Sequence, residues 1–278
     1  MGYVKTLLIV LAVGAFGLVR VVRAAPTPTV IAYDDAADGV YAVGNPYHAL
    51  NGGFGLTPWI HSLPAFPSGS GGPLHAYVGS STANDPIGPT LTNIDTAGRA
   101  WGNNADPTGS TFLARRSLAF DLPVGGTYSI SYDAGNVDGP QTISFGLAGN
   151  AMCSFFFNPS SAPNYQFTDV LSSTSLVTPI AQDWGGLRLT LTRDTATTYF
   201  FEIKRLADNF TFGIGPFAYD TTTITGIRTI NVSNVDGGAG LGHSMYLNAI
   251  EATAIPEPVG IGWAVGLATF VRMRKKRS

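Results

Sequence analysis

Residues 187–205 read LRLTLTRDTATTYFFEIKR, two alternating runs with a polar break between them. The first run, Leu187–Arg193, places its three leucines at every second position, and the second, Thr198–Arg205, does the same with a tyrosine, a phenylalanine and an isoleucine. A period of two is that of a β-strand, so each run has one apolar and one polar face. The four residues between them, 194–197, have the length and composition of a hairpin loop. The sequence therefore predicts an antiparallel hairpin with one face in a core.

The same alternation recurs through residues 25–255, where a helical period is almost absent. Short alternating runs between turn residues are typical of antiparallel sheets with one face buried and one in water. Several such runs at this spacing indicate an all-β sandwich of two sheets. Besides the hairpin, we expect strands at 127–133 (TYSISYD), 142–147 (TISFGL), 226–234 and 245–252.

The charge and cysteine content limit the possible partners. Residues 25–255 contain eight Arg and Lys against 17 Asp and Glu, a net charge of −9. Phosphate backbones repel such a domain, so we expect no nucleic acid partner. The single cysteine, Cys153, excludes an intrachain disulfide, and its apolar surroundings (MCSFFF) predict a buried strand thiol. The domain must therefore be stable through its core alone.

The first 24 residues have the pattern of a secretion signal. Lys5 precedes a mostly apolar run, 7–19, and a small-residue cleavage pattern that ends at Ala24. As a helix this run spans about 20 Å, short of the roughly 30 Å hydrocarbon core, which argues against a permanent transmembrane helix. We therefore expect a signal helix over 1–24, removed by signal peptidase after Ala24, and an exported chain.

The C-terminal end, 256–278, combines three features in order. Pro256, Glu257 and Pro258 precede a mostly apolar, uncharged segment at 259–271. A basic cluster follows, made of Arg272, Arg274, Lys275, Lys276 and Arg277. Basic residues stay on the cytoplasmic side of a membrane, which leaves the preceding domain outside.

This combination resembles the PEP-CTERM sorting tail. The resemblance implies a short C-terminal membrane helix, transient attachment to the inner membrane, and recognition and cleavage by an exosortase. It also implies a Gram-negative bacterium that makes exopolysaccharide. An ordinary tail anchor that is never cleaved is the alternative.

A second resemblance covers most of residues 33–252. Its short motifs are, in order, 33–35 (YDD), 51–59 (NGGFGLTPW), 98–102 (GRAWG), 114–118 (ARRSL), 132–136 (YDAGN), 143–147 (ISFGL) and 246–251 (YLNAIE). This order resembles the concanavalin-A-like, jelly-roll domains common in PEP-CTERM proteins. The resemblance implies a jelly-roll β-sandwich over 25–255. Such domains often have Asp-Asn where this chain has Asn248-Ala249, a departure that argues against a metal role for the last strand.

Catalytic sequence patterns are missing from the domain. Concanavalin-A-like folds include glycosidases, which need two carboxylates that flank the glycosidic bond. Residues 25–255 contain only two glutamates, Glu202 and Glu251, in different predicted strands. No Gly-x-Ser-x-Gly elbow occurs, and the four histidines lack zinc-site spacing. We therefore expect a non-catalytic domain without a cofactor, with pairs of Asp as the remaining route to glycosidase chemistry.

Calcium is a candidate ligand of two acidic turns, because it prefers carboxylate and amide oxygens. One turn carries Asp133, Asn136 and Asp138, and the other carries Asp34, Asp35 and Asp38. The alternative is plain turn chemistry, in which Asp and Asn accept hydrogen bonds from the nearby backbone.

Sugar binding has its own candidates, because carbohydrate sites combine an exposed aromatic ring with hydrogen-bonding side chains. Trp101 with Asn103 and Asn104 lies in a Gly-rich stretch, and Trp184 lies between an aspartate and a glycine. Packing in the core is the alternative for both tryptophans, and it is what we expect for Trp59.

These expectations describe an exported cell-surface or extracellular-matrix protein that an exosortase sorts, with a non-catalytic domain that is a candidate for binding exopolysaccharide. Two alternatives stay open: a secreted carbohydrate-active enzyme of glycosidase type, and a purely structural matrix component.

Overall fold

The computed structural model describes residues 26–61, 74–82, 92–106, 110–147, 149–239 and 241–256. The expected signal helix, the cleavage site at Ala24, Glu257 and Pro258 of the sorting motif, the apolar segment and the basic cluster lie outside these residues. The stretch from Pro28 to Ile255 forms one compact unit. Within the described ranges, no helix is both long and apolar enough to cross a membrane.

The described residues form fifteen strands and one short 3₁₀ helix. The strands are β1 (Thr29–Asp34), β2 (Ile60–His61), β3 (Leu74–Gly79), β4 (Ala100–Ala105), β5 (Thr111–Ser117), β6 (Thr127–Asp133), β7 (Gln141–Leu147), β8 (Asn150–Phe157), β9 (Asn164–Asp169), β10 (Thr174–Ala181), β11 (Leu187–Arg193), β12 (Thr198–Arg205), β13 (Thr211–Ala218), β14 (Thr229–Val235) and β15 (Met245–Ala254). The 3₁₀ helix, η1 (Leu241–His243), precedes β15.

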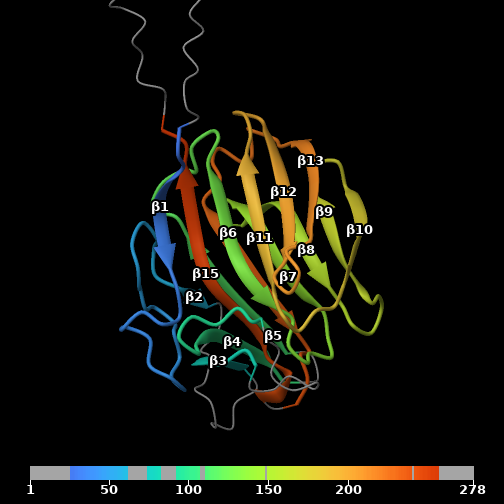
Figure 1. Ribbon diagram of the computed structural model, residues 1–278. Helices are drawn as coiled ribbons and strands as arrows, with labels where there is room; N and C mark the ends of the chain where they lie inside the picture. Colours follow the sequence, from blue (N-terminus) through green and yellow to red (C-terminus); the bar gives the residue numbers. More distant parts are fainter. Residues whose placement is uncertain are drawn as a thin grey trace, which may run out of the picture. The chain divides into compact units, whose positions relative to one another are not determined.

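All strand pairs are antiparallel, and they build two sheets (Figure 1). The eight-stranded sheet has the order β13-β12-β11-β6-β15-β4-β3, and β1 also pairs with β15. The seven-stranded sheet has the order β10-β9-β8-β7-β14-β5-β2. Strands far apart in the chain are neighbours: β6 lies between β11 and β15, and β14 lies between β7 and β5. The predicted all-β, jelly-roll sandwich is therefore confirmed.

The alternating runs form strands where the sequence places them. β6, β11 and β12 have the predicted bounds, and β7 begins one residue earlier. β15 extends two residues beyond the predicted end because its last part pairs with β1. β14 begins only at Thr229. The predicted hairpin loop is present, since the amides of Asp194 and Thr195 both donate to the Thr198 carbonyl, at 3.0 and 3.2 Å.

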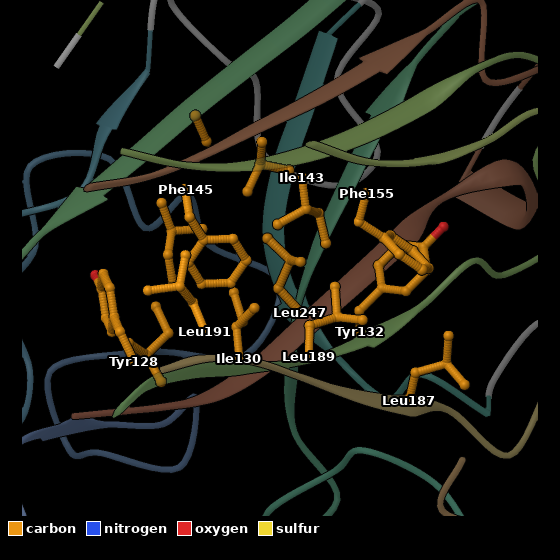
Figure 2. Packing of buried hydrophobic residues seen from close by; sticks show 14 of the residues in the cluster. Tyr128, Ile130, Tyr132, Ile143, Phe145, Phe155, Leu187, Leu189, Leu191 and Leu247 are labelled. Carbon is orange, nitrogen blue, oxygen red and sulfur yellow. The ribbon is translucent and has the colours of Figure 1, made fainter. Parts of the chain in front are cut away.

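The core lies between the two sheets. Figure 2 shows side chains of β6 and β11 pointing toward side chains of β7 and β8. Tyr128 meets Phe145 edge to face with ring centroids 6.0 Å apart, and Tyr132 meets Phe155 at 5.4 Å. Burying each such apolar side chain contributes about 1.5–3 kcal/mol. Cys153 on β8 is fully buried, as predicted, and burial raises the pKa of its thiol.

A buried ion pair links β5 to β1 inside this sandwich. Nη2 of Arg116 lies 2.6 Å from Oδ2 of Asp34, and both side chains are fully buried. Arg116 also donates to the carbonyls of Leu50 and Gly52, at 3.0 and 3.1 Å. The Tyr41 hydroxyl donates to the same carboxylate oxygen, at 2.5 Å. One guanidinium therefore binds two loop carbonyls and a carboxylate, and the Tyr41 hydroxyl binds the same carboxylate.

Candidate functional site

A groove lies at one end of the sandwich, around Trp184. It has a volume of about 730 Å³. It is formed by the turn between β8 and β9, the loop between β10 and β11, the turn after β12 and the loop before β4. Its lining residues are Thr92, Phe157, Pro159, Pro163, Ala181, Gln182, Asp183, Trp184, Gly185 and Ala207.

The loop that carries Trp184 is held by a set of short-range contacts. Oδ1 of Asp183 accepts a hydrogen bond from the amide of Gly185 at 2.7 Å, and the Asp183 amide donates to the Tyr165 hydroxyl at 3.3 Å. Gly186 has a φ of +82°, and an added Cβ there would lie 2.4 Å from a methyl of Ile94. Only glycine fits that position without strain. The loop therefore presents the half-buried ring of Trp184 in a fixed place.

The polar groups of the groove are a carboxylate, an amide and a hydroxyl. Oδ2 of Asp183 lies 3.8 Å from Nε of Arg205. Nη2 of the same arginine lies 2.6 Å from Oδ2 of Asp208. Nε2 of Gln182 donates to the carbonyl of Gly135 at 3.1 Å, so its Oε1 is the end that can accept from a ligand. Phe157, Pro159 and Pro163 supply apolar walls. The groove thus combines an aromatic ring, apolar walls and hydrogen-bonding side chains.

Of the predicted sugar-binding residues, the structure places only Trp184 at a groove. Trp101 is fully buried, with its ring 5.1 Å from that of Trp59 and 5.5 Å from that of Tyr41. Its side chain lies on the inward face of β4, so no ligand reaches it. The prediction for Trp101 was wrong, and the prediction that Trp59 packs in the core is confirmed.

The two asparagines beside Trp101 are also buried. Asn103 accepts from the hydroxyl of Tyr47, and Nδ2 of Asn104 donates to the carbonyl of His243 at 3.1 Å. The loop before β15 covers Asn104, and the Gly-rich sequence around Trp101 did not reveal that cover. Neither residue can contact a sugar, which corrects the prediction for both.

The carboxylates of the first acidic turn are bound by neighbouring groups of the protein. Asp34 is paired with Arg116, Asp35 accepts from the hydroxyl of Tyr33 at 2.6 Å, and Asp38 accepts from the Gly53 amide at 3.0 Å. Burial raises the pKa of Asp34 to about 6, opposed by the hydrogen bond from Tyr41 and the charge of Arg116. These carboxylates serve the ion pair and local turns, as the turn-chemistry alternative states.

The second turn is arranged in the same way. Oδ1 of Asp133 accepts from the Gly135 amide at 2.8 Å, and Asp138 lies 3.3 Å from Nδ1 of His243. Asn136 lies between them, half-buried. Across the described part of the chain, no three His, Cys, Asp or Glu side chains are placed to hold a metal ion. The observed contacts of Asp133 and Asp138 are those of the turn-chemistry alternative and of a pair with His243, and calcium binding by either turn stays a prediction.

The two glutamates of the domain lie far apart. Glu202 is on β12 and Glu251 on β15, with β11 and β6 between these strands. Three steps of about 4.8 Å between neighbouring strands separate them by roughly 14 Å. Glycosidase carboxylates lie about 5–9.5 Å apart. The pair does not have the spacing that glycoside hydrolysis needs.

Several groove residues could not be predicted from the sequence. Gln182, Thr92 and the two prolines of the β8–β9 turn come from segments that are distant in sequence and carry no shared motif. The available signal was the Pro-x-x-x-Pro turn directly after the aromatic run of β8, which predicts a rigid loop at a strand end.

No protein-family model matches the chain, and no curated protein matches it. Among solved structures, the CBM2 module of the evolved Dit of Lactobacillus casei BL23 phage J-1 is similar, with 10% identity, a TM-score of 0.49, and coverage of 85% of this chain and 100% of that chain. Lectin II from Ulex europaeus has 9% identity and a TM-score of 0.36, and the match covers 70% and 96% of the two chains. Crh5 transglycosylase in complex with NAG has 12% identity and a TM-score of 0.40, with 69% and 87% covered. At these identities and TM-scores the likeness says nothing about ligand or chemistry.

Proposed function

We propose that the sandwich is a non-catalytic carbohydrate-binding domain whose site is the groove around Trp184. The observation that carries this proposal is the half-buried indole held beside Asp183 and Gln182 in a groove of about 730 Å³. A sugar ring stacks its C–H face on an aromatic ring, and its hydroxyls hydrogen-bond to carboxylates and amides. The groove offers both kinds of contact within one loop.

Charge favours a neutral saccharide as the ligand. The domain carries a net charge of −9, and Asp183 is the only carboxylate among the described lining residues of the groove. An acidic polysaccharide would be repelled by this field. Arg205, the nearest cation, is already bound to Asp208 through two hydrogen bonds. A neutral polyhydroxylated ligand meets no such repulsion.

Asp183 is the one carboxylate among the groove residues that the structure describes, which favours binding over hydrolysis. A glycosidase needs an acid and a partner carboxylate on the two sides of the bond. Asp183 accepts a hydrogen bond from the Gly185 amide and lies near Arg205, so its carboxylate already has partners within the protein. Release of reducing sugar from a bound polysaccharide would overturn the non-catalytic assignment.

Substitution of Trp184 tests whether the groove binds carbohydrate. Trp184→Ala is expected to weaken binding to a neutral polysaccharide at least tenfold, because truncating an aromatic anchor costs about 2 kcal/mol. The matched control is Phe200→Ala, which removes a 38% exposed ring from the outer face of β12. A glycan array identifies the ligand, and titration calorimetry measures each affinity. Equal affinity of the two variants would remove the groove as the site.

We further propose that the chain is exported, held in the inner membrane as a precursor, and delivered to the cell surface or matrix after an exosortase removes the tail. The proposal is supported by the order of Pro256, Glu257, Pro258, apolar segment and basic cluster after a secretion signal. The described fold is compatible with it, because Thr29 at the start of β1 pairs with Ala254 at the end of β15, so the first and last strands begin and end side by side (Figure 1).

Cleavage of the C-terminal tail can be measured directly. Mass spectrometry of the exported protein is expected to find peptides up to β15 and none that cover residues 259–278. Deleting the exosortase gene in the host is the control, and it should restore the tail peptides. A mature surface protein that keeps its basic cluster would contradict cleavage and favour an ordinary tail anchor.

A further inference from the structure

The outer face of the seven-stranded sheet carries two aligned rows of side chains that the groove does not use. Strand register places the first row across all seven strands: Ile60, Arg115, Asn231, Ser144, Ser154, Thr168 and Ser175. The second row crosses six strands beside it: Leu113, Ser233, Thr142, Phe156, Gln166 and Val177. Both rows alternate with core residues, so they point away from the other sheet.

These rows have one charged member, Arg115, near one end. The outer face of the eight-stranded sheet differs, since it carries Arg188, Glu202, Lys204 and Glu251. Neighbouring strands lie about 4.8 Å apart, so five consecutive members of the first row, from Asn231 to Ser175, repeat an amide and hydroxyls at that interval. The seven-stranded sheet thus presents an ordered, nearly uncharged array.

Most of the polar side chains in the array have no internal partner. Thr168 and Ser175 share a hydrogen bond at 2.9 Å. The side chains of Ser144, Ser154 and Gln166, like those of Thr142, Asn231 and Ser233, have no hydrogen-bond partner among the described residues. Each can both donate and accept, which suits sugar hydroxyls, themselves donors and acceptors.

An aromatic ring lies at the centre of the array. Phe156 on β8 is half-buried, and its register neighbours are Thr142 on β7 and Gln166 on β9. At the β2 end, a hollow of about 360 Å³ lies between Ile60, Leu113, Arg115 and Asn231. A ring between a hydroxyl and an amide is an arrangement that stacks a sugar and holds its substituents.

We propose that this face is a second carbohydrate site, which binds an extended neutral polysaccharide chain lying across the strands over Phe156. A protein partner fits less well, because interface cores are enriched in large aromatic residues and this array has one. A polyanion fits less well because of the net charge of the domain. The site does not depend on the groove, and a long chain that reaches both gains affinity by simultaneous binding.

Two variants test the face, each with a matched control on the opposite sheet. Phe156→Ala removes the ring, and Phe200→Ala removes an exposed ring from β12. Ser154→Glu places a charge in the first row, where a large side chain also blocks the sugar, and Thr192→Glu does the same on the outer face of β11. Affinity electrophoresis uses a soluble β-glucan, a galactomannan and a xylan, with alginate as the acidic probe. Circular dichroism melting verifies that each variant is folded.

We expect both face variants to weaken binding to a neutral polysaccharide about tenfold and both controls to change it less than twofold. The unaltered protein should not be retarded by alginate. If Trp184→Ala abolishes binding and the face variants leave it intact, the face proposal is overturned and the groove stands. The reverse result supports the face and overturns the groove. No binding of any neutral probe by the unaltered protein overturns both.

Self-association is the competing use of this face. If the unaltered protein sediments as a dimer and Ser154→Glu converts it to a monomer without changing polysaccharide binding, the array is an interface between copies and the proposal is overturned. A monomer whose polysaccharide binding falls in Ser154→Glu supports the proposal.

Discussion

Arg116→Ala is expected to lower the free energy of unfolding by about 3–5 kcal/mol, because removing one partner of a buried ion pair leaves the other charge uncompensated. The stranded group is the Asp34 carboxylate, fully buried 2.6 Å from the guanidinium. Two loop carbonyls, of Leu50 and Gly52, lose their donors as well. Urea denaturation followed by tryptophan fluorescence measures the loss.

The loss of stability in Arg116→Ala should increase as the pH rises. In the folded protein the pKa of Asp34 is already raised to about 6, so protonation favours the folded state and this group costs stability as pH rises through that value. Without Arg116 the pKa rises further, since an opposing charge is gone. The deficit of Arg116→Ala is therefore expected to be larger at pH 8 than at pH 5. A deficit that grows on acidification would contradict the pairing.

Two controls separate burial from charge. Arg228→Ala breaks the Arg228–Asp121 pair, which has a distance of 2.5 Å but side chains 46% and 42% exposed. It is expected to cost less than about 1 kcal/mol, as exposed pairs do. The double variant Arg116→Leu, Asp34→Asn removes both charges and should recover part of the loss. If it is no more stable than Arg116→Ala, the uncompensated charge is not the cause.

Trp101→Ala is expected to lower the free energy of unfolding by about 3–5 kcal/mol, the range for removing a large aromatic side chain from a core. Trp101 packs edge to face on Trp59 and lies within 6.2 Å of the Tyr47 ring, so its removal opens a cavity among aromatic residues. Thermal and urea unfolding measure the change. Carbohydrate affinity of the folded variant should be unchanged.

Trp184→Ala is the matched control for this substitution. Its ring is half-buried at a loop, so the variant should lose less than about half as much stability while losing affinity. The two variants thereby distinguish a tryptophan that contributes to stability from one that contributes to carbohydrate affinity. A Trp101→Ala protein that unfolds like the unaltered protein and binds sugar weakly would contradict the buried position.

The hairpin of β11 and β12 could be predicted because the residues that determine it are close together in the sequence. Leu187, Leu189 and Leu191 mark one face by themselves, and four polar residues set the turn. Alternation also places the side chain of Arg116 on the buried face of β5, together with those of Phe112 and Ala114. An arginine on a buried face indicates a buried partner of opposite charge. Its partner, Asp34, lies 82 residues earlier and is brought to it only by the packing of two sheets.

The groove was only partly predictable for the same reason. Trp184 could be named from its polar and glycine neighbours, but the identical reasoning selected Trp101, which the fold buries. Alternation tells which residues share a face of a strand and does not tell whether a loop covers that face. The array around Phe156 needs the register of seven strands, which no single segment encodes.

The place of β15 has a consequence for biosynthesis. It is the last strand of the domain, yet it lies within the eight-stranded sheet, with β6 on one edge and β4 and β1 on the other. While Met245–Ala254 is still inside the ribosome, β1 lacks its partner and β6 has one free edge. The eight-stranded sheet therefore cannot be completed before the last strand of the domain has been synthesised.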